Sequence, residues 1–159
     1  MTNQLVIDAS VAAKWFLKDE LEGDVDLAEE ILGLFLDQEI ELHAPDIFRK
    51  EVCGVLARAC LTHLFRGGPP CIMKADAQQH VRDLFRLPIQ IHGETAERSV
   101  AALQLAVDYS KGYYDMTYVR LAEELDCQWC TADERFLAPT REGLPRHRVL
   151  ILSTLRAES

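Results

Sequence analysis

Four acidic residues stand at positions where a protein surface rarely places carboxylates. Asp8 and Asp133 each follow a short apolar stretch that reads as a buried strand. Glu51 and Asp115 lie in helical stretches, and each borders the apolar stripe of its helix instead of lying opposite it. If the strands are parallel, their carboxyl ends meet at one edge of a sheet, where α/β proteins bind ligands. We therefore expect these four carboxylates to converge at that edge.

Converging carboxylates repel one another. At about 4 Å and an effective dielectric near 20, a pair costs about 4 kcal/mol. A chain relieves this repulsion by protonation, by pairing with bases or by binding a hard cation. Three or four carboxylate ligands suit Mg²⁺ or Mn²⁺, which activate water and stabilise charge on a phosphoryl group. Taken singly, each acid is also explained as a helix cap or a surface ion pair, so the indication comes from the set of four.

The order of apolar segments predicts the elements that bring these acids together. Short apolar strands alternate with amphipathic helices, a pattern typical of an α/β domain with a mostly parallel central sheet of about five strands flanked by helices. At 159 residues and 48% hydrophobic, the chain is expected to form a single domain over 1–159. The strands are predicted at 4–8, 39–43, 88–92, 127–130 and 148–152, and the helices at 11–17, 24–37, 46–63, 72–86, 94–109 and 113–125.

Three features of these helices are specific enough to test. Asp46, directly after Pro45, is expected to cap the helix over 46–63. The last two predicted helices carry apolar stripes, which predict the sides facing the interior. The stripes are Ala96, Val100, Leu103 and Val107 in the helix over 94–109, and Tyr114, Tyr118, Leu121, Ala122 and Leu125 in the helix over 113–125.

Charge is distributed unevenly along the chain. The net charge of −9 argues against a simple nucleic-acid binder. However, the segment from Asp19 to Glu41 holds ten carboxylates and no Lys or Arg, and outside it 16 acidic residues face 17 basic ones. The rest of the surface is therefore free to meet a phosphate backbone. The acidic segment itself is interpreted as a solvated helix face or as a docking surface for a basic partner.

Compartment and cysteine use follow from simple patterns. No apolar run is long enough to span a bilayer, and the N-terminal MTNQLVID does not resemble a secretory signal. A cytoplasmic location with no membrane partner and five free cysteines is therefore expected. Cys127 and Cys130 form a CxxC, but in a strand they would face opposite sides, and no second pair completes a zinc site.

Four motifs in chain order resemble the PIN-domain ribonucleases of the VapC toxin type, which belong to toxin–antitoxin pairs. They are VIDASVAAKWFL, PDIFRKEVCGVLARA, YYDMTYVRLAEEL and CTADERF, and they span residues 5 to 137. The family's four acids fall on Asp8, Glu51, Asp115 and Asp133, its small hydroxyl residue on Ser10 and the Thr of its last motif on Thr131.

The sequence also departs from the family's pattern. Gly54 stands where an Asn is common, Met116 replaces a usual small residue, and Arg120 replaces an apolar or small one. RGGPPC, residues 66–71, resembles an extended loop. No acid is lost, so these departures concern the choice of substrate rather than activity.

The resemblance implies metal-dependent hydrolysis of single-stranded or loop RNA. Asp8, Asp115 and Asp133 would hold Mg²⁺ or Mn²⁺, and Glu51 would complete the acidic cluster and orient a water. The resemblance also implies a homodimer and a cognate antitoxin, which we hypothesise docks along the acidic helix over 24–37. Ser10 and Thr131 would hydrogen-bond the carboxylates or the scissile phosphate, unless they only cap strand ends. Lys14, one helical turn beyond Ser10, would contact phosphate or remain an exposed lysine.

Two other classes of function share features of this sequence. A phospho-accepting or phosphatase-type domain also puts an Asp after its first strand. The phosphatase, however, needs a second Asp where Ser10 stands, and a receiver needs a Lys after a late strand, which VLILSTLRAES lacks. A non-catalytic PIN-like interaction module predicts the loss of one or more acids, and none is missing.

Overall fold

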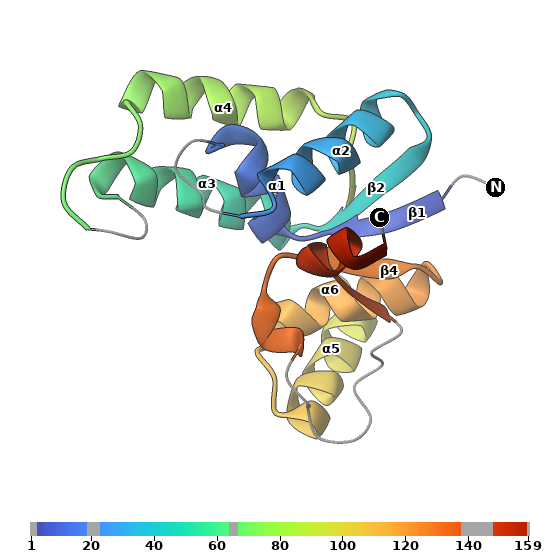
Figure 1. Ribbon diagram of the computed structural model, residues 1–159. Helices are drawn as coiled ribbons and strands as arrows, with labels where there is room; N and C mark the ends of the chain where they lie inside the picture. Colours follow the sequence, from blue (N-terminus) through green and yellow to red (C-terminus); the bar gives the residue numbers. More distant parts are fainter. Residues whose placement is uncertain (1–2, 19–22, 64–66, 138–147, 159) are drawn as a thin grey trace.

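The computed structural model describes residues 3–18, 23–63, 67–137 and 148–158 (Figure 1). Residues 19–22 of the acidic segment lie outside the described residues, and so does REGLPR (141–146), a stretch whose composition predicts a loop. The same is true of residue 66, the first of the RGGPPC stretch.

A sheet of five parallel strands forms the centre of the fold, in the order β3-β2-β1-β4-β5. This confirms the predicted parallel sheet. Because β2 and β3 lie on one side of β1 and β4 and β5 on the other, the strand order reverses between β1 and β4. Ligands bind at such a switch point, beyond the carboxyl ends of the strands. The strands are β1 (Asn3–Ile7), β2 (Ile40–Pro45), β3 (Gln90–His92), β4 (Gln128–Thr131) and β5 (Val149–Ile151).

Helices cover both faces of this sheet. Helix α6 packs on β1, β2 and β4, with α5 outside it, whereas α1, α2 and α3 contact one another and the strands from the other side (Figure 1). Within the described residues, no helix has the length and apolar character needed to cross a membrane. The helices are α1 (Ala9–Phe16), α2 (Val25–Leu36), α3 (Ile47–Leu61), α4 (Lys74–Arg86), α5 (Ala96–Tyr109) and α6 (Tyr113–Glu124), with 3₁₀ helices η1 (Glu134–Leu137) and η3 (Leu152–Glu158).

Aromatic packing fixes the region between β1 and β4. Trp129 on β4 is fully buried and stacks on Tyr118 of α6, with ring centroids 5.7 Å apart. Phe136 of η1 meets the same indole edge-on at 5.0 Å. These rings lie beside fully buried Ile7 and Cys130, whose strands pair in register. The ends of β1 and β4, which lead into the residues that follow them, are therefore anchored in a densely packed core.

The predicted cap at Asp46 is wrong. Asp46 does precede α3, but its side chain makes no capping hydrogen bond, and its backbone is already helical at φ −64° and ψ −22°. A capping side chain reaches the first-turn N–H groups from an extended backbone. Asp8 (φ −82°, ψ 149°) and Thr95 (φ −128°, ψ 161°) have that conformation and do cap α1 and α5.

The predicted interior stripes of α5 and α6 need correction. On α5, Val100, Leu103 and Val107 are 66%, 55% and 68% exposed, because this helix packs on α6 through its opposite side, where Ala102 is buried. On α6, Tyr114 is 60% exposed, since burial on this helix begins only at Met116. Across the described residues no element covers the stripe on α5, so it forms an exposed apolar surface.

All five cysteines are free thiols, as expected. Cys130 on β4 is buried, and Cys127, directly before β4, is half-buried. The first cysteine of the CxxC therefore lies at the edge of the core and the second lies inside it.

Candidate active site

Asp8 lies at the switch point of the sheet, and its carboxylate accepts four hydrogen bonds. It follows β1 directly, and its own N–H donates to the Cys130 carbonyl across the strand pair at 2.9 Å. Its Oδ2 accepts from the Ser10 N–H (3.0 Å), from the Ser10 hydroxyl and from the Thr131 hydroxyl (3.3 Å). Its Oδ1 accepts from the Trp129 indole N–H at 3.3 Å. The carboxylate is therefore fixed from two strands and a helix terminus at once.

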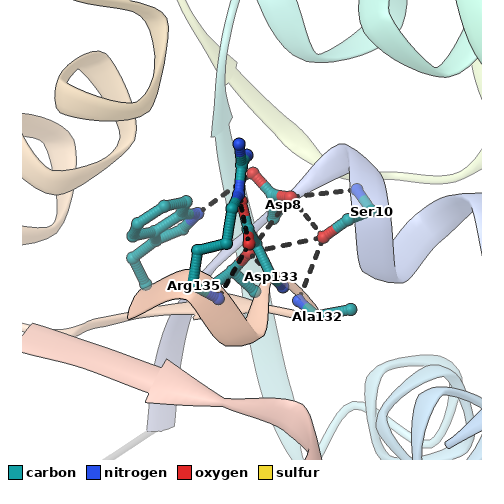
Figure 2. A network of polar contacts seen from close by, with 7 residues as sticks. Asp8, Ser10, Ala132, Asp133 and Arg135 are labelled. Atoms are coloured by element: carbon teal, nitrogen blue, oxygen red, sulfur yellow. Dashed lines mark hydrogen bonds and ion pairs between the residues drawn. The ribbon is translucent and has the colours of Figure 1, made fainter. Parts of the chain in front are cut away.

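Ser10 and Thr131 join the two strand ends into one network (Figure 2). The Ser10 hydroxyl donates to Asp8 and accepts from the Ala132 N–H at 3.0 Å. The Thr131 hydroxyl donates to Asp8 and accepts from the Asp133 N–H at 3.1 Å. Each hydroxyl thus ties the loop after β4 to the carboxylate after β1. Both residues orient Asp8 directly, the first of the two roles considered for them from the sequence.

Asp133 is engaged by a neighbouring arginine. The Arg135 guanidinium binds both oxygens of Asp133, with Nε at 2.9 and 3.0 Å, and the Arg135 N–H caps the same carboxylate at 3.0 Å (Figure 2). This bidentate pairing lowers the pKa of Asp133. Arg135 is mostly exposed, so this ion pair is solvated and can be exchanged for another cation.

Glu51 reaches the site from α3 and is held by α6. Its Oε2 accepts a hydrogen bond from the Tyr118 hydroxyl. Burial raises the pKa of Glu51, and the negative charges of Asp8 and Asp115 raise it further, while the bond from Tyr118 acts in the opposite direction. Tyr118 is almost fully buried, so its ring is held by packing and its hydroxyl is a fixed hydrogen-bond donor to the Glu51 carboxylate.

Asp115 projects from the first turn of α6. Burial raises its pKa, and the charges of Asp8 and Asp133 add to the effect, which Arg135 and Lys111 partly oppose. Burial likewise raises the pKa of Asp8, and its hydrogen bonds oppose that rise. Three of the four predicted carboxylates therefore have raised pKa values, so their surroundings disfavour the ionised form. These three come from different parts of the fold.

The comparisons with known proteins agree with this geometry. The model of the PIN domain matches residues 5–141 of the sequence. The chain belongs to the PIN domain family. The match includes all four acids, so the family assignment covers the whole candidate site.

Solved structures share the fold of this PIN domain at low sequence identity. A toxin–antitoxin complex from Klebsiella pneumoniae has a TM-score of 0.62 at 13% identity, over 93% of this chain and 97% of that chain. A protein from Pyrobaculum aerophilum has a TM-score of 0.62 at 19% identity, over 99% and 96%. The toxin VapC20 from Mycobacterium tuberculosis, described as cleaving the sarcin-ricin loop, has a TM-score of 0.58 at 16% identity, over 89% and 99%. A comparison with curated proteins finds no match.

The donor set of this PIN domain suits a hard divalent cation. Four carboxylates supply oxygen ligands. Burial raises the pKa of Asp8, Glu51 and Asp115, and the charges of neighbouring carboxylates raise those of Glu51 and Asp115 further. Across the part of the chain that the structure describes, no three acidic, histidine or cysteine side chains are gathered closely enough to hold a metal ion as they stand. Three of the four carboxylates are instead engaged within the protein: Asp8 by Ser10, Thr131 and Trp129, Glu51 by Tyr118, and Asp133 by Arg135.

Several residues of the site were not found from the sequence. Trp129, Tyr118 and Arg135 each bind one of the predicted carboxylates. A buried indole N–H or phenol usually has a hydrogen-bond partner, which is the signal that could have linked the first two to the acids. Lys111, beside Asp115 and Asp133, lies over the Phe136 ring at 5.0 Å and adds a second cation to the site.

Lys14 does not contribute to the site. It is buried, and its ammonium donates to the Gly23 carbonyl at 2.9 Å, next to the charge of Asp24. It therefore stabilises the connection between α1 and α2 and is neither the phosphate contact nor the exposed lysine considered from the sequence.

Proposed function

We propose that this PIN domain is a metal-dependent ribonuclease that hydrolyses phosphodiester bonds of single-stranded or loop RNA, and that it acts as the toxin of a toxin–antitoxin pair. The observation that carries the proposal is the proximity of Asp8, Glu51 and Asp115, which come from the end of β1, from α3 and from α6. Burial raises the pKa of all three, and the charges of neighbouring carboxylates raise those of Glu51 and Asp115 further. A cluster of this kind is arranged for a cation and for the anionic group that the cation binds.

In this proposal Asp8, Asp115 and Asp133 would hold Mg²⁺ or Mn²⁺, directly or through water, and Glu51 would complete the cluster. When bound, such a cation would supply a water of lowered pKa and positive charge to offset that of the phosphoryl group. Ser10, Thr131 and Trp129 keep the Asp8 carboxylate in one orientation.

The remaining side chains have roles that follow from their contacts. Tyr118 occupies Glu51 Oε2, so Glu51 Oε1 remains to orient the attacking water and to accept its proton. Arg135 and Lys111 add positive charge beside Asp133 and Asp115, where an RNA phosphate would enter. When RNA enters, Arg135 can exchange Asp133 for the phosphate, since both offer two oxygens to its planar fork.

The structural neighbours support the biological setting. One is a toxin–antitoxin complex and another is a toxin that cleaves an RNA loop. The competing phosphatase-type interpretation needs a second Asp two residues after Asp8, and Ser10 stands at that position. The purified protein should therefore cleave members of a panel of single-stranded and hairpin RNAs with Mn²⁺ or Mg²⁺ and not with EDTA. Absence of cleavage across the panel would contradict the ribonuclease proposal.

We further propose that the protein forms a homodimer through the exposed stripe of α5, consisting of Val100, Leu103 and Val107. Three large apolar side chains on one helix face favour contact with a second apolar surface. Leu103→Glu should convert the dimer to a monomer, measured by light scattering after size-exclusion chromatography. Leu61→Glu, at an exposed apolar residue of α3, is the matched control and should leave the mass unchanged. A dimer that persists in Leu103→Glu would exclude this face as the interface.

The acidic helix α2 is proposed as the docking surface for a basic segment of the antitoxin. Asp26, Glu29 and Glu30 are exposed on it, as predicted. Asp26 pairs with Arg156 and Glu29 with Lys18, so their charge is partly compensated within the chain. The solubility role considered from the sequence remains the competing interpretation.

Replacing Asp26, Glu29 and Glu30 with Asn or Gln should slow association with the antitoxin severalfold and reduce its dependence on salt, because steering by surface charge acts mainly on the association rate. RNA cleavage by the free protein should not change, since α2 contributes no residue to the site. The measurement is the association rate at low and moderate salt. A rate and a salt slope equal to those of the wild type would leave only the solubility role for this helix.

A further inference from the structure

A cavity of about 250 Å³ opens at the same edge of the sheet as the carboxylates but is lined by different residues. Pro45 and His92, the last residues of β2 and β3, form its base. Its rim includes Lys50 and Tyr114, which directly precede Glu51 and Asp115 in the chain. The proposed function assigns no role to this cavity, although its rim lies one residue from two of the four acids.

The cavity lining brings the cationic side chains of Lys50, Arg98 and Arg120 together with the carboxylates of Asp46 and Glu94. Lys50 is exposed and, among the described residues, forms no direct ion pair. Arg120 has a buried Nε with no hydrogen-bond partner among the described residues, and its Nη1 lies 3.5 Å from Glu123. By contrast, Arg98 on the same wall is satisfied by Glu124 and by the Gly93 carbonyl. A buried donor without a partner is costly, so Arg120 favours a ligand with acceptor atoms.

The cavity also offers an aromatic face. Tyr113 is held in place because its hydroxyl donates to Glu94 at 2.6 Å, and its ring meets that of Tyr114 edge-on with centroids 5.7 Å apart. Tyr114 is 60% exposed, so one face of its ring remains available at the rim. Exposed aromatic rings beside cationic side chains are how proteins bind the bases and phosphates of single-stranded nucleic acids.

The size of the cavity limits what it can hold. Pockets for drug-sized ligands have volumes of roughly 300–1,000 Å³, and this one lies just below that range. Its polar lining groups differ in kind and include a guanidinium at Arg120, a hydroxyl at Thr117, an imidazole at His92 and carboxylates at Asp46 and Glu94. Such a set can hydrogen-bond the edge of a planar heterocycle that has both donors and acceptors.

We propose that this cavity binds one nucleotide of the RNA strand next to the scissile phosphodiester, with its base against Tyr114, its edge toward Arg120 and its phosphate at Lys50. The inference rests on the proposed ribonuclease function for its substrate class. It assigns to Arg120, one of the departures from the family's pattern, the reading of a flanking base.

The test is a titration of the isotope-labelled protein in EDTA with 5′-mononucleotides, followed by NMR. Saturable shifts are expected at residues 92–94 and 113–117, whereas ribose 5-phosphate and inorganic phosphate should bind more weakly. Tyr114→Ala should weaken mononucleotide binding about tenfold, and Tyr114→Phe should retain it. Phe85→Ala, which removes an exposed ring outside the cavity, is the matched control and should bind as the wild type does.

Each outcome bears on the inference separately from the ribonuclease proposal. Equal binding of ribose 5-phosphate, or unchanged affinity in Tyr114→Ala, would overturn the assignment of a base site. A wild-type protein that cleaves RNA but shows no mononucleotide shifts would overturn the inference alone. Mononucleotide binding by a protein that cleaves no RNA would sustain the site and contradict the proposed reaction.

Discussion

Asp115→Asn is expected to reduce the rate of RNA cleavage by more than a hundredfold while the protein remains folded. Removing residues that only orient metal ligands typically costs about 10–100-fold, so the loss of a proposed ligand should cost more. Asp115 is the sharpest choice among the four acids because, among the described residues, its carboxylate accepts no hydrogen bond that Asn would disrupt. At Asp8, by contrast, the Asn amide would have to face either the Trp129 N–H or the hydroxyls of Ser10 and Thr131.

The measurement is the initial rate of cleavage of one RNA substrate with Mn²⁺ in excess. Asp76→Asn, at an exposed acid of α4, is the matched control and should cleave at the wild-type rate. Circular dichroism checks that both variants are folded. Undiminished cleavage by Asp115→Asn would remove this residue from the proposed metal site.

Removing the charge should also stabilise the metal-free protein. The folded-state pKa of Asp115 is raised, so its ionised form opposes folding at neutral pH. The metal-free wild type should therefore gain stability as the pH falls through that raised value, and Asp115→Asn should have the higher melting temperature at pH 7, by a few degrees.

Millimolar Mn²⁺ or Mg²⁺ is expected to raise the melting temperature of the wild type by about 5–10 °C. A ligand that binds only the folded state at a hundred times its Kd adds about 2.7 kcal/mol, and each kcal/mol corresponds to roughly 2–4 °C for a chain of this length. The variant with Asn or Gln at positions 8, 51, 115 and 133 should respond far less. Sodium chloride at matched ionic strength is the control. Equal shifts in the wild type and the variant would show a general salt effect instead of a site.

The fold and the acidic residues were predictable because they follow from local patterns. LVI before Asp8 and WCT before Asp133 mark strands by apolar content alone, and a parallel sheet then brings their ends together. The position of Glu51 beside an apolar stripe likewise indicated its direction, and burial together with the charges of Asp8 and Asp115 raises its pKa. These are consequences of periodicity, which a single sequence records.

The partners of these acids were not predictable in the same way. Whether Arg135 turns back onto Asp133 depends on the backbone of η1, and whether Tyr118 reaches Glu51 depends on how α3 and α6 pack. The α5 stripe shows the limit most clearly. Its periodicity correctly indicated an apolar face, but amphipathicity does not say whether that face meets the rest of the same chain, and here Val100 and Val107 face outward.

The pairing of β1 with β4 has a consequence for the timing of synthesis. The carboxylate at Asp8 emerges from the ribosome well before Trp129 and Thr131, more than 120 positions later, on which its orientation depends. A nascent chain that lacks β4 has an unsupported Asp8 and no Asp133, and closing so long a loop comes late in folding. A protein proposed to cleave RNA would thus stay inert during translation of the segment between β1 and β4 and become competent only after β4 and Asp133 have been released.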